Sequence, residues 1–104
     1  MNNKTLGKIG ENMAARFLER KGYKIVSRNW RCFLGEIDIV AREKDFLVFV
    51  EIKTRTSFCF GPGYLSVTPQ KQRKLISLGL AFMKRYGLSD AACRIDIVSI
   101  HLDQ

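Results

Sequence analysis

The chain is short of the residues on which disulfide frameworks, zinc sites and charge-relay enzymes depend. It has three cysteines, an odd number with no CxxC pair, and a single histidine, His101. A disulfide framework and a zinc ribbon are therefore excluded, and Ser-His-Asp or Cys-His catalysis loses its support. We expect Cys32, Cys59 and Cys93 to be small buried hydrophobic residues.

Long apolar segments are absent as well. No stretch approaches the roughly 18 consecutive apolar residues of a membrane span, and the opening MNNKTLGKIGE lacks the apolar region of a secretory signal. We therefore expect a cytoplasmic protein with no membrane partner. The seven Phe and 46% apolar residues exclude a disordered basic tail, and 104 residues predict a single domain over 1–104.

Positive charge is abundant and unevenly distributed. The chain has 18 Lys plus Arg against 10 Asp plus Glu, a net charge of +8. Residues 1–31 contain eight basic and two acidic residues, residues 32–68 four and five, and residues 69–104 six and three. Basic segments on both sides of an acidic middle favour a polyanionic partner, nucleic acid, over charge that serves solubility alone.

Hydrophobic spacing predicts helices over 4–21 and 69–86 and strands over 23–30, 36–42, 46–53 and 94–101. The order helix, three strands, helix, strand predicts an α/β fold, with a mixed sheet and a helix covering each face. The apolar stripe of the first helix contains Leu6, Ile9, Met13, Ala14 and Phe17. The connection 54–67 has no clear period, and a connection of this length is typical of functional segments.

The residues that could take part in catalysis or bind a metal ion lie in the segments GEIDIV and FVEIKTR. Alternation places Glu36 with Asp38 on one face of a strand, and Glu51 with Lys53 on one face of the next. If the turn between the strands has two residues, Asp38 lies opposite Phe49; if it has four, Asp38 lies opposite Glu51. In both cases Asp38, Glu51 and Lys53 point the same way, whereas a three-residue turn would place them on opposite faces.

Clustered carboxylates imply a cation among them, because like charges across a sheet destabilise it. Lys53 supplies one positive charge, and a divalent metal ion would supply the rest. Ligands that are all oxygen favour Mg²⁺, with Mn²⁺ as a substitute. The alternative is a solvated sheet face with an ordinary Glu51–Lys53 ion pair, but the unbroken apolar run LVFV favours a cleft at the end of a buried strand.

Asp38, followed after twelve residues by Glu51-Ile52-Lys53, resembles the D…(D/E)xK signature of the PD-(D/E)xK nuclease superfamily, with its restriction-endonuclease-like αβββαβ core. The blocks GKIGENMAARFLERKGYKIVSRNWR, GEIDIVA, LVFVEIKTR and RIDIVSI resemble the narrower YraN-type endonuclease-like family, related to archaeal Holliday junction resolvases. This resemblance covers nearly the whole chain. One departure is Ile37, which stands where the signature has proline.

The resemblance implies a Mg²⁺-dependent endonuclease. Asp38 and Glu51 would be metal ligands with the Ile52 carbonyl as a third, Lys53 the catalytic lysine, and Glu11 the glutamate that such resolvases bring from a helix. The substrate implied is DNA, branched or single-stranded, and related resolvases suggest a homodimer by analogy. Gly7 and Gly10, in the same helix, suggest close approach of another backbone, either the sheet or a DNA phosphate.

Several basic residues are candidates for contacts that position DNA without reading its sequence. These are Lys4, Lys8, Arg28, Arg31 and Arg55, together with Gln70 and Lys71 at the start of the second helix, where a helix N-terminus favours phosphate. Trp30, Phe58, Phe60 and Tyr64 either stack on unpaired bases or pack within the protein. Because nothing resembles a base-reading helix, we expect selectivity for shape.

The rival hypothesis is a non-catalytic nucleic-acid-binding protein that retains the nuclease fold. Its positive charge would be the same. The acidic cluster favours the nuclease, because three carboxylates facing a polyanion do not help simple binding.

Overall fold

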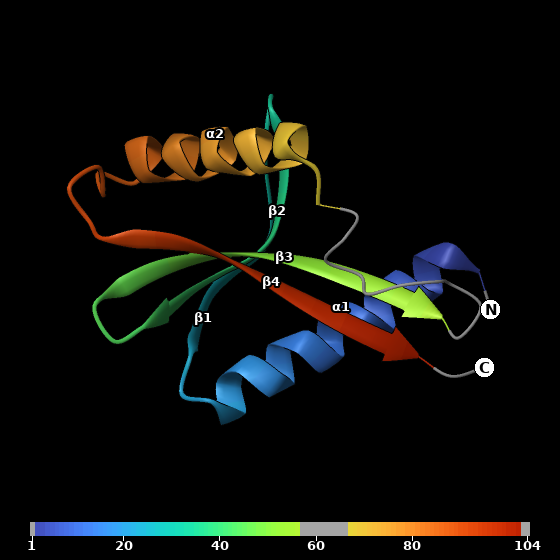
Figure 1. Cartoon of the computed structure of the whole chain (residues 1–104). Helices are drawn as coiled ribbons and strands as arrows, with labels where there is room; N and C mark the ends of the chain where they lie inside the picture. Colours follow the sequence, from blue (N-terminus) through green and yellow to red (C-terminus); the bar gives the residue numbers. More distant parts are fainter. Residues whose placement is uncertain (1, 57–66, 103–104) are drawn as a thin grey trace.

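The structure is a computed structural model, and it describes residues 2–56 and 67–102. The order of its elements confirms the predicted α/β fold (Figure 1). The described residues form two helices and four strands: α1 (Asn3–Arg20), β1 (Lys24–Cys32), β2 (Gly35–Glu43), β3 (Phe46–Thr56), α2 (Pro69–Arg85) and β4 (Cys93–Leu102).

The four strands form one mixed sheet in the order β1-β2-β3-β4. The pairs β1–β2 and β2–β3 are antiparallel, and β3–β4 is parallel, with α2 as the crossover. Arg42 lies opposite Leu47, which is the register of the four-residue alternative. Glu43 and Phe46 pair as well, so the turn itself is Lys44-Asp45, and Lys44 adopts the left-handed conformation that tight hairpin turns require (φ 55°).

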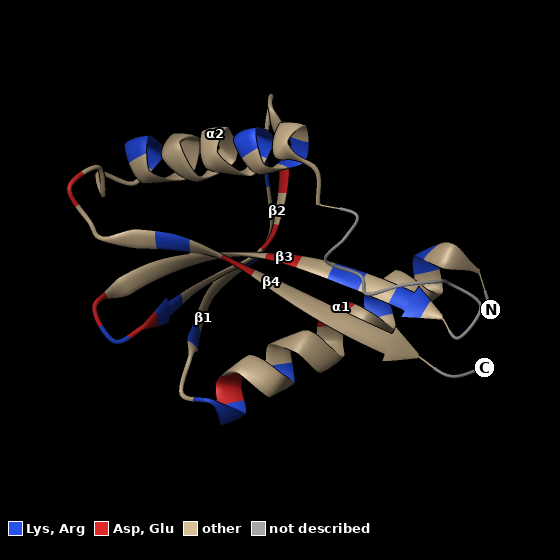
Figure 2. Cartoon of the chain, in the orientation of Figure 1, with Lys and Arg blue, Asp and Glu red and all other residues tan. Residues whose placement is uncertain are grey.

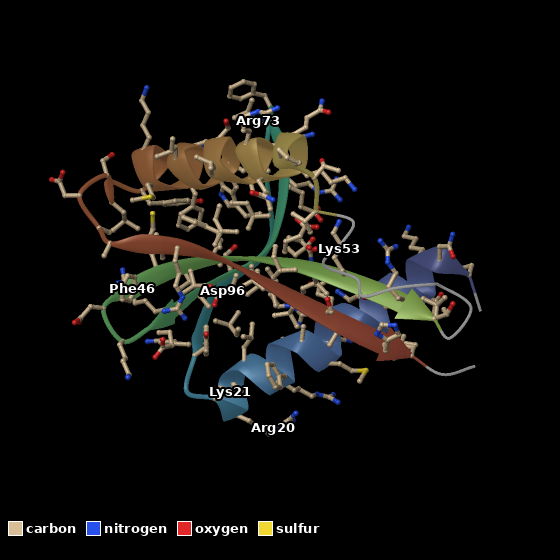
Figure 3. All side chains as sticks on the ribbon, in the orientation of Figure 1. Arg20, Lys21, Phe46, Lys53, Arg73 and Asp96 are labelled. Carbon is tan, nitrogen blue, oxygen red and sulfur yellow. The ribbon has the colours of Figure 1, made fainter. Side chains whose placement is uncertain are left out.

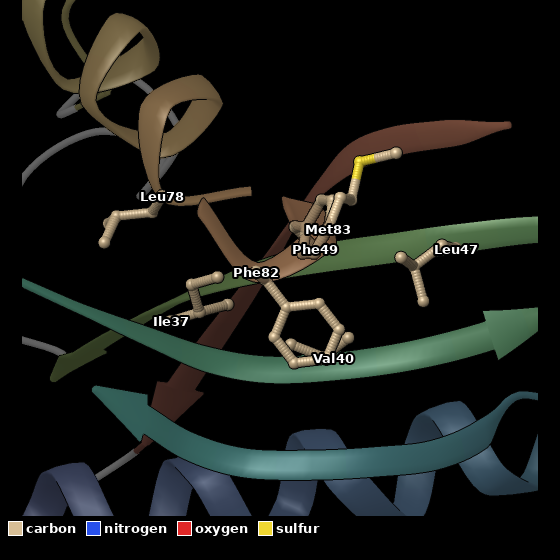
Figure 4. Packing of buried hydrophobic residues seen from close by; sticks show 7 residues of the cluster. All are labelled: Ile37, Val40, Leu47, Phe49, Leu78, Phe82 and Met83. Atoms are coloured by element: carbon tan, nitrogen blue, oxygen red, sulfur yellow. The ribbon is translucent and has the colours of Figure 1, made fainter. Parts of the chain in front are cut away.

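A helix covers each face of the sheet, as predicted (Figure 1). On the α2 side, Phe49 from β3 packs with Leu78 and Phe82 in the larger apolar cluster (Figure 4). On the α1 side, Leu18 packs with Val48 and the remaining members of a second cluster. The apolar run of β3 is therefore buried on both faces, which fixes where its polar end emerges.

The face that α1 buries differs from the predicted stripe. Its buried residues are Gly10, Ala14, Ala15 and Leu18, whereas Met13 and Phe17 are 42% and 39% exposed. Small side chains bring the helix close to the sheet. A Cβ added at Gly10 would overlap the Thr54 side chain, so the sheet explains this glycine.

Two minor expectations are also resolved. Cys93 is exposed and Cys32 is half-buried, so the prediction of buried cysteines was wrong for Cys93. Cys93 begins β4, the last strand in the sheet order β1-β2-β3-β4 of the described residues. Cys59 lies outside the described residues. Within 2–56 and 67–102, no helix has the length and hydropathy to cross a membrane.

Candidate functional site

The sheet opens at Asp38, between β2 and β3. The β2–β3 ladder ends at the pair Ile39–Val50, and β2 continues towards its start paired only with β1. Ile37 packs in the α2 cluster and Ile39 in the α1 cluster. Residues two apart in a regular strand share a face, so β2 turns over at Asp38.

The same bend is present in β1. Arg28 pairs with Ile39 and Trp30 with Ile37, so Asn29 lies level with Asp38. Asn29 has φ 56°, a left-handed conformation that is unusual inside a strand. Sequence reasoning did not identify this residue, although Asn tolerates that conformation better than most residues. The two irregular positions together turn the β1–β2 hairpin away from β3 and towards α2.

The Asp38 carboxylate lies across the opening. Its Oδ2 accepts a hydrogen bond from the Ile52 backbone N–H at 2.8 Å, in place of a bond between the two strands. Burial raises the pKa of Asp38 to about 6; the Ile52 hydrogen bond opposes this, and the charges of Glu51, Glu36 and Glu11 add to it. This environment favours the neutral, protonated carboxyl group, and a cation bound beside it would favour the carboxylate.

Glu51 and Lys53 follow on β3, at the polar end of the buried run. The Lys53 Nζ lies 3.4 Å from the Glu51 Oε1, and both side chains are mostly buried. Figure 3 shows Lys53 in the space between β3 and the beginning of α2. The buried run of β3 therefore ends in polar residues, as predicted. Asp38 lies beside them, because its carboxylate accepts a hydrogen bond from the Ile52 backbone N–H.

Glu11 of α1 is held on the same side of the opening as Asp38. Its Oε1 accepts hydrogen bonds from the Arg28 Nε at 3.0 Å and the Asn29 Nδ2 at 2.8 Å, and its side chain is only 12% exposed. Lys8 lies at 4.0 Å from the other oxygen. Glu11 is thus a fixed group, and Asn29 connects it to the bend in the sheet.

Two adjoining hollows surround these groups. The α1 hollow, of about 720 Å³, is lined by Glu11, Asn29, Asp38, Ile52 and the basic residues Lys4, Lys8 and Arg55. The α2 hollow, of about 260 Å³, is lined by Glu51, Lys71, Lys74 and apolar residues of α2. Glu36 and Lys53 line both, so the carboxylates lie in one continuous cleft. Figure 2 shows Lys and Arg positions on the N-terminal part of α1, towards the end of β3 and at the beginning of α2, the elements that contribute the basic rim.

Only some of the residues predicted to contact nucleic acid line the two hollows. Lys4, Lys8 and Arg55 line the α1 hollow and Lys71 the α2 hollow, but Gln70 is exposed and lines neither. The guanidinium groups of Arg28 and Arg31 are engaged with Glu11 at 3.0 Å and Glu36 at 2.7 Å.

Of the aromatic candidates, Trp30 packs within the protein. Its ring lies edge-on to Phe82 at 5.3 Å, and its Nε1 donates to the Tyr86 hydroxyl at 3.1 Å. Phe58, Phe60 and Tyr64 lie outside the described residues.

The carboxylates do not converge fully on one point. In 2–56 and 67–102, no three His, Cys, Asp or Glu side chains are arranged to hold a metal ion. A site here would depend on the Asp38 and Glu51 carboxylates and a backbone oxygen such as that of Ile52.

The geometry defines a class, a small basic α/β protein with an acidic cleft where its sheet opens. Comparison with known proteins then gives the family. The model of uncharacterised protein family UPF0102 matches residues 10–100, and this chain belongs to that family.

Individual relatives agree with this assignment. The chain is 49% identical over 100 residues to a UPF0102 protein of Geobacter metallireducens, covering 96% of this chain and 82% of the relative. It is 40% identical over 103 residues to a UPF0102 protein of Caldanaerobacter subterraneus subsp. tengcongensis, covering 99% and 84%. The similarity therefore includes the whole αβββαβ core.

Proposed function

We propose that this protein is a metal-dependent phosphodiester hydrolase that acts on nucleic acid. The observation that carries the proposal is the gathering of Asp38, Glu51 and Lys53 at the opening between β2 and β3, inside a cleft with a basic rim. Paired carboxylates inside a basic cleft suit a substrate whose phosphate arrives together with a metal ion.

The donor set fits Mg²⁺, with Mn²⁺ as a substitute. Mg²⁺ keeps several waters and is usually held by one or two carboxylates, so the absence of a third side-chain ligand among the described residues is compatible with it. Asp38 and Glu51 would hold the ion with the Ile52 carbonyl. When bound, the ion would polarise a phosphate oxygen and acidify a coordinated water.

Lys53 and Glu11 would act beside these ligands. Lys53, which pairs with Glu51, would orient the attacking water and stabilise charge that develops on the phosphate. Glu11, held by Arg28 and Asn29, would accept a hydrogen bond from water at the α1 side of the cleft.

Nucleic acid would reach the site across the basic rim. Lys4, Lys8 and Arg55 in the α1 hollow and Lys71 in the α2 hollow would neutralise a phosphate backbone that passes Asp38. Arg28 and Arg31 are less available, because carboxylates already engage them. Backbone contacts of this kind favour selection by shape, for instance of branched or single-stranded DNA.

A non-catalytic binder of nucleic acid is the second candidate. The observation that favours it is that no three potential side-chain ligands are arranged around a metal position within the described residues. The positive charge would serve a binder equally well.

Cleavage assays separate the two candidates. Labelled single-stranded, duplex, flap and four-way DNA, and the matching RNA, are incubated with the protein in Mg²⁺, Mn²⁺ or EDTA. The nuclease hypothesis expects metal-dependent products that Asp38→Asn and Glu51→Gln abolish. Tight binding with no products would favour the binder, and variants that cut as well as the wild type would indicate a contaminating nuclease.

A further inference from the structure

The hairpin between β1 and β2 carries an exposed phenylalanine at its tip. Phe33 and Leu34 connect the paired residues Cys32 and Gly35. The Phe33 side chain is 93% exposed, whereas no other large hydrophobic residue of the described chain exceeds 59%. Figure 1 shows the end of this hairpin extending past α2. A ring in this position contributes nothing to the apolar core.

The hairpin below the ring is firmly supported. Leu34, Cys32 and Trp30 pack against the α2 cluster, and Trp30 also donates a hydrogen bond to Tyr86. Gly35, with φ 140°, leaves room for the Lys74 side chain, which a Cβ there would meet at 3.3 Å. Phe33 is therefore presented on a braced element, and its exposure is not the result of a loosely packed end.

Cations lie near the base of the hairpin tip. Arg31 lies two residues before Phe33, with a side chain that is 80% exposed, and pairs with Glu36. The Lys74 side chain of α2 lies beside Gly35, two residues after Phe33. An exposed aromatic ring flanked by Lys and Arg is the usual means by which proteins hold an unpaired base, since the ring stacks and the cations contact phosphate.

The tip also has a fixed relation to Asp38, because one strand joins them. Asp38 lies five positions after Phe33, a backbone path of at most about 17 Å at the rise of a β-strand. Stacked nucleotides of one strand rise about 3.4 Å each. The two backbone positions are therefore at most about five stacked nucleotides apart.

We propose that Phe33 stacks on an unpaired base of the bound nucleic acid and so directs the protein to sites where a duplex is interrupted. This inference rests on the proposed function for its substrate class. It adds a specificity residue that sequence reasoning did not identify, because a single Phe in a short turn produces no recognisable pattern.

Binding in EDTA tests the inference without turnover. Fluorescence anisotropy is measured with a labelled single strand, a blunt duplex and a duplex containing a short internal bubble. We expect Phe33→Ala and Phe33→Leu to weaken binding to the single strand and the bubble by roughly 5- to 150-fold, with little change for the blunt duplex. Phe33→Trp should retain affinity, with tryptophan fluorescence quenched by the bound base.

Leu80→Ala is the matched control, because Leu80 is an exposed apolar residue of α2 that lines neither hollow. It should bind all three probes as the wild type does. If the wild type binds and cleaves interrupted DNA but both Phe33 variants bind it equally well, only this inference is overturned, and a protein contact would explain the ring. If the wild type binds none of the probes, the proposed function fails with it.

Discussion

Carboxylates gather at both ends of the sheet, but their partners differ. At the far end Arg94 donates to Asp96 at 3.1 Å, to Glu43 at 3.1 Å and to the Tyr23 hydroxyl at 2.8 Å. Tyr23 in turn donates to Asp96, and the guanidinium lies over the Phe46 ring. Figure 3 shows Phe46 and Asp96 well separated from Lys53 along the sheet.

The Arg94 network is a complete structural unit. One guanidinium lies between two carboxylates, and the hydrogen bond to Asp96 leads the interactions that raise the pKa of Arg94 above its ordinary value. Around Asp38, the three neighbouring carboxylates each have a cation of their own: Glu11 pairs with Arg28, Glu36 with Arg31 and Glu51 with Lys53. The Asp38 carboxylate accepts from the Ile52 N–H, and under the proposed function a metal ion would be its cation.

The largest expected effect separates the two ends by activity. Asp38→Asn should lower the rate of metal-dependent cleavage by at least about 100-fold, because it removes a charged ligand at the reacting phosphate. Asp96→Asn should leave the rate within a factor of about two, because that carboxylate lies in the Arg94 network. Single-turnover kinetics on the best DNA substrate would check both. Equal losses in the two variants would contradict the distinction.

The helix that carries Glu11 offers a second contrast, between its two glycines. Gly10→Ala should destabilise the fold by about 1–3 kcal/mol, because the new methyl group overlaps Thr54 where α1 meets β3. Gly7→Ala meets open space and should stabilise the helix by up to about 1 kcal/mol. Urea denaturation measures both. Weaker DNA binding by Gly7→Ala alone would indicate that Gly7 admits the substrate backbone.

The pH dependence of folding stability, measured in EDTA and without a substrate, also distinguishes Asp38 from Asp96. The pKa of Asp38 in the folded protein, about 6, lies above the ordinary value of 3.8. The folded state therefore binds this proton more tightly, and its stability falls as pH rises from about 4 to 6. Asp38→Asn should gain on the order of 1–2 kcal/mol above pH 6, allowing for solvent screening, and nothing below about pH 4.

For Asp96→Asn we expect the opposite change in stability in the same measurement. It removes an acceptor from Arg94 and Tyr23, so its melting temperature should fall at neutral pH. Thermal denaturation at pH 4 and pH 7.5 gives all four values. A loss of stability in Asp38→Asn at pH 7.5 would show that the Asp38 carboxylate is a structural group like Asp96.

The smallest expected effect comes from divalent ions. Mg²⁺ that binds only the folded protein should raise its stability by about 0.4 kcal/mol at a concentration equal to Kd, and more above it. The shift should persist in Asp96→Asn and disappear in Asp38→Asn. Melting temperature against Mg²⁺ concentration at constant ionic strength is the measurement. A shift that is equal in both variants would place the ion elsewhere.

Much of the fold could be predicted because its signals are local. The apolar run of β3 predicted a strand buried on both faces. The predicted helix over 69–86 begins at Pro69, where the preceding Thr68 side chain accepts from the Lys71 N–H. Alternation predicted that Asp38, Glu51 and Lys53 point the same way. In the structure Asp38 lines the α1 hollow and Glu51 the α2 hollow, with Lys53 in both, because β2 turns over at Asp38.

The remaining features depend on long-range packing. The turn of β2 at Asp38 and the left-handed Asn29 beside it reflect how the hairpin reaches α2, and no short pattern records that. The buried face of the first helix was predicted from its large apolar residues. Because α1 lies close to the sheet, small residues such as Ala14 and Ala15 occupy that face instead, and Met13 is exposed. The exposure of Phe33 likewise depends on the tertiary packing around the hairpin, which a local sequence pattern does not reveal.

The parallel pairing of β3 with β4 has a consequence for folding. Each residue of β4 pairs with one that lies 46 positions earlier, as Cys93 does with Leu47. The β1–β2–β3 segment closes through short hairpins, whereas this last pairing requires a long loop to close after α2 has formed. The antiparallel part of the sheet, which carries Asp38, Glu51 and Lys53, should therefore assemble before the β3–β4 pairing completes the sheet.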